Sequence, residues 1–210
     1  MRVTKAPTTR TAIPDSGLTD ACSVLSDFCD STANDNHTTR YGVTLDNRGF
    51  TQKPKGAQVA GITRRMQGRG PEEVTLAQLV SAIASGVTWC GGTFEPSKAG
   101  WGQFIGQRLF GLDFDNKVEV LDPMDALGRC VTEGIDVLLW YPTFSATVEP
   151  WRPRFRIVID AGVTLDDATA RDFDVFLKGT FPEADRTFNR AHNRLLFGTR
   201  WAVQPMEMVA

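Results

Sequence analysis

The stretch that decides the fold is residues 107–116, which read QRLFGLDFDN. Bulky apolar residues are followed by two aspartates, and Asn116 is typical of a turn. The pattern therefore predicts a buried strand that ends near Asn116. Side chains at positions i and i+2 of a strand lie on one face, so Asp113 and Asp115 should project together. Close carboxylates repel each other unless a cation lies between them, and such oxygens suit Mg²⁺ or Mn²⁺. A strand ending in a solvated acidic turn is the alternative interpretation.

Length, composition and charge limit the class of protein. The chain has 210 residues, of which 41% are hydrophobic and 23% charged, enough for a sizeable core. The net charge is −2, so any nucleic acid must be bound through a local basic face. We find no run of about 20 apolar residues and no apolar signal-peptide core, so we expect no membrane partner and a cytoplasmic location, the host cytoplasm if a phage encodes the chain.

The cysteines and histidines argue against a zinc site. None of the four cysteines forms a Cys-x-x-Cys pair, and the chain has two histidines in all. The cysteines are therefore interpreted as reduced core residues. These residues are Cys22, Cys29, Cys90, Cys130, His37 and His192.

The clearest predicted helix covers residues 75–86. Thr75 and Gln78 form a capping box, an apolar stripe follows, and Gly86 ends the helix. It leads into the strand that carries the two aspartates.

Two further helices and a strand follow. A helix over 122–133, with Asp122 as its cap and Pro123 at its first position, should bury one face that includes Val131. A helix over about 165–178 should end at Gly179. An apolar strand is expected over 137–141. Helices and strands thus alternate, which predicts an α/β or α+β domain.

The first part of the chain is predicted to be an N-terminal extension, residues 1–71, before a core over 72–210, with one compact domain overall. It would hold a polar arm over 1–20, a short helix over 20–29, a strand at 41–45, and a mobile basic, glycine-rich connection over 46–71. The connection is either a solvated loop or an arm that binds a nucleic-acid backbone. Its basic residues are Lys53, Lys55, Arg64, Arg65 and Arg69.

Three segments after the aspartates carry further polar side chains. Residues 141–147 read YPTFSAT, residues 153–160 read PRFRIVID, and an acidic segment at 181–185 precedes NRLLFG at 193–198. Arginines two positions apart in the second segment share one face of a strand. That face is either a phosphate clamp or the solvent side of an edge strand.

This series of segments resembles the catalytic domain of the archaeo-eukaryotic primase superfamily, most of all the primase-polymerase (prim-pol) domains of phage and plasmid replication proteins. The resemblance covers residues 72–200 and implies a primase-like α/β (α+β) core, with mixed sheets flanked by helices. Five landmarks stand in family order: the helix and glycine turn at 75–92, LDFDN at 112–116, TFS at 143–145, PRFRIV at 153–158, and Asp185 before RLLFG at 194–198.

The resemblance also implies roles for single residues. The metal-binding and catalytic carboxylates would be Asp113, Asp115 and Asp185, with Asp160 as a competing candidate for the third. The family usually has a histidine shortly after the serine, and this chain has Ala146 there instead. Nucleotide binding would involve Ser145, Arg154, Arg156 and Arg194.

The implied function is template-directed nucleotidyl transfer, by a DNA primase or polymerase, in phage or plasmid replication. The reaction would use two Mg²⁺ or Mn²⁺ ions. Its partners would be a DNA template and primer, nucleoside triphosphates, and a helicase domain or protein. Two alternatives stay open: a non-catalytic origin- or DNA-binding module on a decayed primase fold, and a metal-dependent nuclease or phosphohydrolase.

Three structural expectations follow. The strands with the acids and the arginines should lie in one cleft. At least one of the acids should have a raised pKa unless an arginine offsets the repulsion. The change Asp113→Ala should leave the fold intact, because it relieves repulsion.

Overall fold

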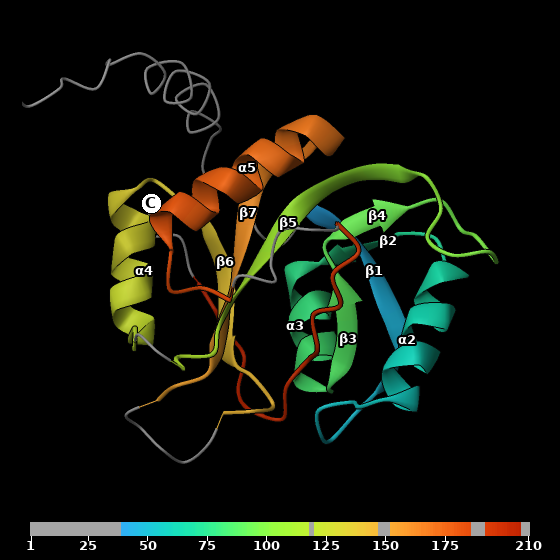
Figure 1. Cartoon of the computed structure of the whole chain (residues 1–210), viewed down its shortest axis with the longest axis horizontal. Helices are drawn as coiled ribbons and strands as arrows, with labels where there is room; N and C mark the ends of the chain where they lie inside the picture. The colour runs from blue at the N-terminus through green and yellow to red at the C-terminus, as the bar shows by residue number, and fades with distance from the viewer. Residues whose placement is uncertain (1–38, 118–119, 147–151, 186–191, 207–210) are drawn as a thin grey trace, which may run out of the picture. The chain divides into compact units, whose positions relative to one another are not determined.

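The computed structural model describes residues 39–117, 120–146, 152–185 and 192–206. Over these residues the fold is α+β, with two antiparallel sheets and four helices (Figure 1). The arm and helix predicted within residues 1–29 lie outside the described residues. The helices are α2 (Ala57–Gln67), α3 (Leu76–Ala84), α4 (Pro123–Thr132) and α5 (Asp167–Thr180).

The smaller sheet has three strands in the order β2-β1-β3. Its central strand, β1 (Arg40–Gly49), pairs with β2 (Glu72–Thr75) on one side and with β3 (Val87–Cys90) on the other. The sheet therefore joins residues 40–49, predicted to belong to an extension, to strands from the predicted core.

The larger sheet has five strands in the order β4-β5-β7-β6-β8. The predicted strand at residues 107–116 is present as β5, and the one at 137–141 as β6. The five strands are β4 (Gly92–Phe94), β5 (Phe104–Phe114), β6 (Val137–Pro142), β7 (Phe155–Leu165) and β8 (Gln204–Pro205). β5 and β7 form the longest ladder, so the strand with Asp113 lies beside the strand that contains Arg156.

Local sequence explains how α3 and α4 begin. The capping box is present at the start of α3: Thr75 accepts from the backbone of Gln78, and the Gln78 side chain accepts from the backbone of Thr75. Asp122 caps α4, with Pro123 in its first turn. Both starts are confirmed as predicted.

Three details differ from the prediction. Val131 is 80% exposed, because α4 buries Ala126, Leu127 and Cys130, and the side chain after Cys130 turns away from that face. Helix α5 does not end at Gly179; it continues to residue 180.

The third difference is larger: the mobile connection predicted over 46–71 is wrong for residues 46–49, which belong to β1, and for residues 57–67, which form α2. Ile62 and Met66 are buried at helical spacing on one face of α2. Gly56 and Gly68 lie just outside the two ends of the helix. The apolar stripe of α2 is short and is interrupted in the sequence by glycine and arginine residues, so the helical pattern is weak.

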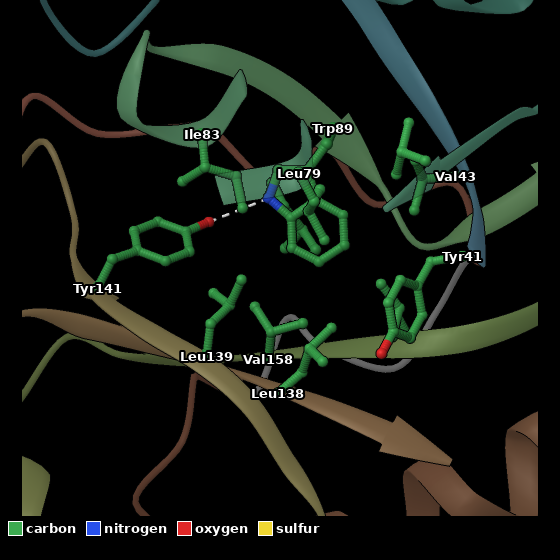
Figure 2. Close-up of a cluster of buried hydrophobic side chains, with 12 residues drawn as sticks. Tyr41, Val43, Leu79, Ile83, Trp89, Leu138, Leu139, Tyr141 and Val158 are labelled. Atoms are coloured by element: carbon green, nitrogen blue, oxygen red, sulfur yellow. Dashed lines mark hydrogen bonds between the residues drawn. The ribbon is translucent and has the colours of Figure 1, made fainter. Parts of the chain in front are cut away.

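The main core lies between the smaller sheet with α3 and one face of the larger sheet (Figure 2). On β5, Leu109 and Gly111 face this core, and Asp113 follows them on the same face. Phe110 faces the other way and packs against Phe173 of α5. The alternation of β5 therefore places Asp113 at the edge of the core between the two sheets.

Candidate functional site

Three residues on neighbouring strands stand in register across the larger sheet. Asp113 of β5 is opposite Arg156 of β7, and Arg156 is opposite Tyr141 of β6. All three lie on the face that points to the main core. Strand pairing thus brings together side chains from positions 113, 141 and 156, and the predicted proximity of the acidic strand to an arginine strand is present for Asp113 and Arg156.

Asp113 is bound by two guanidinium groups. Arg156 Nε donates to Asp113 Oδ1 at 2.5 Å, and Arg194 Nη2 donates to Asp113 Oδ2 at 2.6 Å. The Asp113 side chain is only 16% exposed. Both of its oxygens therefore carry a charge-assisted hydrogen bond.

Arg156 is held in place by further acceptors. Its Nη1 donates to Tyr141 Oη and to the carbonyl oxygen of Phe197, both at 2.7 Å. Trp89 Nε1 also donates to Tyr141 Oη, at 3.1 Å, from inside the core (Figure 2). A buried hydrogen-bond network thus links the core to Asp113.

The pKa of Asp113 is the result of opposing effects. Burial alone would raise this pKa, but Arg156, Arg194 and Lys53 together hold it below its usual value. Asp113 therefore has no raised pKa, because the positive charges of the two arginines and Lys53 outweigh the effect of burial. Asp113 is therefore ionised at neutral pH.

The other two predicted acids lie close to Asp113. Asp115 follows the last residue of β5, and its carboxylate is 2.8 Å from Lys117 Nζ. The backbone N–H of Asp185 donates to the carbonyl oxygen of Asp113 at 2.8 Å, and its carboxylate lies 3.8 Å from Arg194 Nη2. The structure thus places Asp185 beside Asp113.

Asp160, the competing candidate, lies farther along the same ladder. It is opposite Leu109 and forms an ion pair with Arg108 at 2.7 Å. The register separates it from the Asp113 pair by four positions of β5.

One pocket brings several predicted site residues together. Its walls come from the segment after β1, the end of β5, the segment after β6, the start of β7 and residues 197–198. The lining residues are Lys53, Asp113, Asp115, Thr143, Phe144, Ser145, Arg156, Phe197 and Gly198. The pocket encloses about 310 Å³, including its open mouth.

The predicted arginines occupy different places. The guanidinium of Arg156 is directed at Asp113 rather than outward, so it is no free phosphate clamp in this structure. Arg154 precedes β7, and its carbonyl oxygen accepts from Thr143 N. Arg194 lies two residues before Leu196, which forms an antiparallel bridge with Trp89 of β3. From this position the Arg194 side chain reaches Asp113.

The five basic residues of 46–71 also separate. Lys53 lines the pocket. Arg65 pairs with Asp46, whose side chain is fully buried, and Arg69 pairs with Glu72 at the surface. Lys55 and Arg64 are exposed, and neither has an ion pair among the described residues.

Tyr141 is a site residue that the sequence alone does not reveal. It could be found only from the register between β6 and β7, because nothing local marks it. Lys53 was predicted as one of five basic residues that could bind a nucleic-acid backbone, and nothing local distinguishes it from the other four as a pocket residue.

The residues present are suited to a hard cation. Asp113 is ionised and Asp115 lines the same pocket, and carboxylate oxygens are ligands that Mg²⁺ and Mn²⁺ prefer. Across the ranges that the structure describes, no three His, Cys, Asp or Glu residues are already grouped as a metal-binding set. Each oxygen of Asp113 already accepts a hydrogen bond from a guanidinium, so a cation would compete with Arg156 and Arg194 for this carboxylate.

Comparisons with protein-family models, curated proteins and solved structures gave no match. No helix in the described ranges is long and apolar enough to cross a membrane.

Proposed function

We propose that the chain is a template-directed nucleotidyltransferase of the primase-polymerase type. The observation that carries the proposal is one pocket lined by Asp113, Asp115, Ser145 and Arg156, with Asp185 beside it. These residues come from separate segments of the sequence, and each was assigned a role by the family resemblance. A primase-like core is part of the same proposal.

Asp113, Asp115 and Asp185 would hold Mg²⁺ or Mn²⁺. Such ions lower the pKa of a 3′-hydroxyl and neutralise the charge of a triphosphate. In the reaction, the 3′-oxygen bonds to the α-phosphorus, the bond to the leaving pyrophosphate breaks, and the hydroxyl proton passes to water.

The arginines would have two tasks. In the structure they keep Asp113 ionised without a metal. Once a cation takes over that task, Arg194 can turn its guanidinium to the phosphates of a nucleotide. Arg156 keeps its contacts with Tyr141 and Phe197 and orients Asp113.

Primer extension tests the proposal. A primed template is incubated with labelled nucleotides and Mn²⁺, using the wild type, Asp113→Asn and the control Asp160→Asn. We expect extension by the wild type and Asp160→Asn and loss of extension in Asp113→Asn. Degradation of the DNA instead would indicate a nuclease.

A second candidate is a DNA-binding module without catalysis. It is favoured by the double pairing of Asp113, because both carboxylate oxygens already have partners. Binding of the template without extension in Mg²⁺ or Mn²⁺ would support this candidate over the enzyme.

A further inference from the structure

We propose that Lys53 binds the phosphates of the incoming nucleoside triphosphate, and not the backbone of the template. This inference rests on the proposed function. Its basis is that Lys53, from a segment outside the family resemblance, lines the same pocket as Asp113, Asp115 and Ser145.

The backbone on both sides of Lys53 is anchored. Phe50 N donates to the carbonyl oxygen of Gly86 at 3.0 Å, and the Phe50 side chain packs against a buried cluster that includes Ile62. Pro54 follows Lys53 directly and is buried. The chain is therefore held at Phe50 and Pro54, on either side of Lys53, whose side chain is exposed.

Lys53 differs from the other cation in the pocket wall. Arg156 is 4% exposed and donates to Asp113, Tyr141 and Phe197. Lys53 has no hydrogen bond or ion pair to any described residue, and its charge acts on Asp113 only by lowering the pKa of that carboxyl. An ammonium group on a flexible stem can meet a phosphate without breaking an existing contact.

Hydroxyl groups lie in the same wall. Thr143 Oγ1 is buried and has no hydrogen-bond partner among the described residues, and Ser145 also lines the pocket. A buried hydroxyl without a partner is costly, and a ligand oxygen could satisfy it. The pocket thus offers one mobile cation and two hydroxyls to an anionic group.

The position of Lys53 favours a nucleotide over a template backbone, because Lys53 lines one concavity together with Asp113, Asp115 and Ser145. A template backbone is instead bound by cations spread along a track. Lys55 lies two residues away and does not line the pocket, so it is the matched control.

The test compares Lys53→Ala with Lys55→Ala. We expect Lys53→Ala to raise the KM for the nucleotide at least tenfold, while the Kd for primed DNA stays within twofold of the wild type. Lys55→Ala should leave the KM unchanged, and Lys53→Arg should recover most of the loss. If Lys53→Ala weakens DNA binding with an unchanged KM, or changes neither quantity, the inference is wrong.

A binding assay separates this inference from the proposed function. A fluorescent, non-hydrolysable nucleoside triphosphate is titrated into each protein in the presence of Mn²⁺, without DNA. If the wild type extends no primer but binds the analogue at least tenfold more tightly than Lys53→Ala, the enzyme proposal fails and the inference stands. If the wild type does not bind the analogue, the inference fails.

Discussion

The two ends of the β5–β7 ladder each hold a carboxylate paired with arginine, but the pairs differ. Asp160 meets a single guanidinium: Arg108 donates from Nε at 2.7 Å and from Nη2 at 2.8 Å. Gly162 N also donates to Asp160, at 2.9 Å. Asp113 meets two guanidiniums and borders a pocket that also holds Asp115.

The difference separates a structural pair from a candidate site. One arginine and one carboxylate, each satisfied by the other, form a closed pair that helps to fix two strands. At the Asp113 end, three carboxylates lie near two arginines and two lysines, so charges can exchange partners when a ligand arrives. Clusters of interacting ionisable groups in a pocket are typical of functional sites.

Asp113→Ala should have the largest effect of the substitutions at the two pairs. The prediction that Asp113→Ala leaves the fold intact assumed that the change relieves repulsion between acids. The structure contradicts that assumption, because the change leaves the buried Arg156 without its carboxylate partner. We expect a loss of about 3–5 kcal/mol in the free energy of unfolding. Primer extension should also be abolished. Chemical denaturation and the extension assay measure the two effects.

Asp160→Ala is the matched control at the other end. It should lower stability by less, about 1–3 kcal/mol, because Arg108 is more exposed than Arg156, and it should leave extension intact.

The pKa of Asp113 lies below the usual 3.8, so the stabilising contribution of Asp113 is present above pH 3.8 and is lost as the pH falls through the lower, folded-state pKa. The Asp113→Ala loss should therefore be equal at pH 5 and pH 8. Loss of extension in Asp160→Ala but not in Asp113→Ala would reverse the assignment of the two ends.

Asp185→Ala separates activity from stability. The carboxylate is 31% exposed, and the bond from Asp185 N to Asp113 uses only the backbone, which the variant keeps. We expect a change in stability below about 1 kcal/mol together with at least a hundredfold loss of extension. Full extension by a well-folded Asp185→Ala protein would remove this residue from the proposed metal site.

Local patterns predicted the parts of the fold that depend on neighbours in sequence. The capping box at Thr75, the cap at Asp122 and the strand that carries Asp113 are all present. The α+β class also follows from the order of these elements. Each of these features is encoded within about ten residues.

The rest depends on register and on contacts between distant segments. Asp113 lies opposite Arg156 because of the register between β5 and β7. A shift of one residue in this register would place a neighbour of Arg156 opposite Asp113, with its side chain on the other face of the sheet. The position of Arg194 depends on a bridge between Trp89 and Leu196. Helix α2 was missed because its apolar stripe is short and lies among glycines and arginines.

Asp174 of α5 provides a further test, because its carboxyl also interacts with the charge of Arg194. Burial raises the pKa of Asp174 to about 7, against the opposing charges of Lys178 and Arg194. Between about pH 4 and pH 7 the Asp174 carboxyl is protonated in the folded protein and ionised in the unfolded chain. Its contribution therefore makes the free energy of unfolding fall as the pH rises over that range. Asp174→Asn should gain at most about 4 kcal/mol at pH 8, since each pKa unit corresponds to about 1.4 kcal/mol, and nothing at pH 4. Asp172→Asn, exposed on the same helix, should give no such difference in thermal melts.

The smallest expected effect distinguishes Arg64 from Arg65 on α2. Arg65 pairs with the buried Asp46, so Arg65→Ala should lower stability by about 1–3 kcal/mol. Arg64 is exposed and makes no ion pair with a described residue, so Arg64→Ala should leave the melting temperature unchanged.

If Arg64 contacts a template phosphate, Arg64→Ala should reduce by about 1 the slope of the logarithm of the DNA-binding constant against the logarithm of the salt concentration. Anisotropy titrations of primed DNA over a series of salt concentrations measure that slope. An unchanged slope would show that this face of α2 is only solvated, and template binding would have to be sought near Lys55.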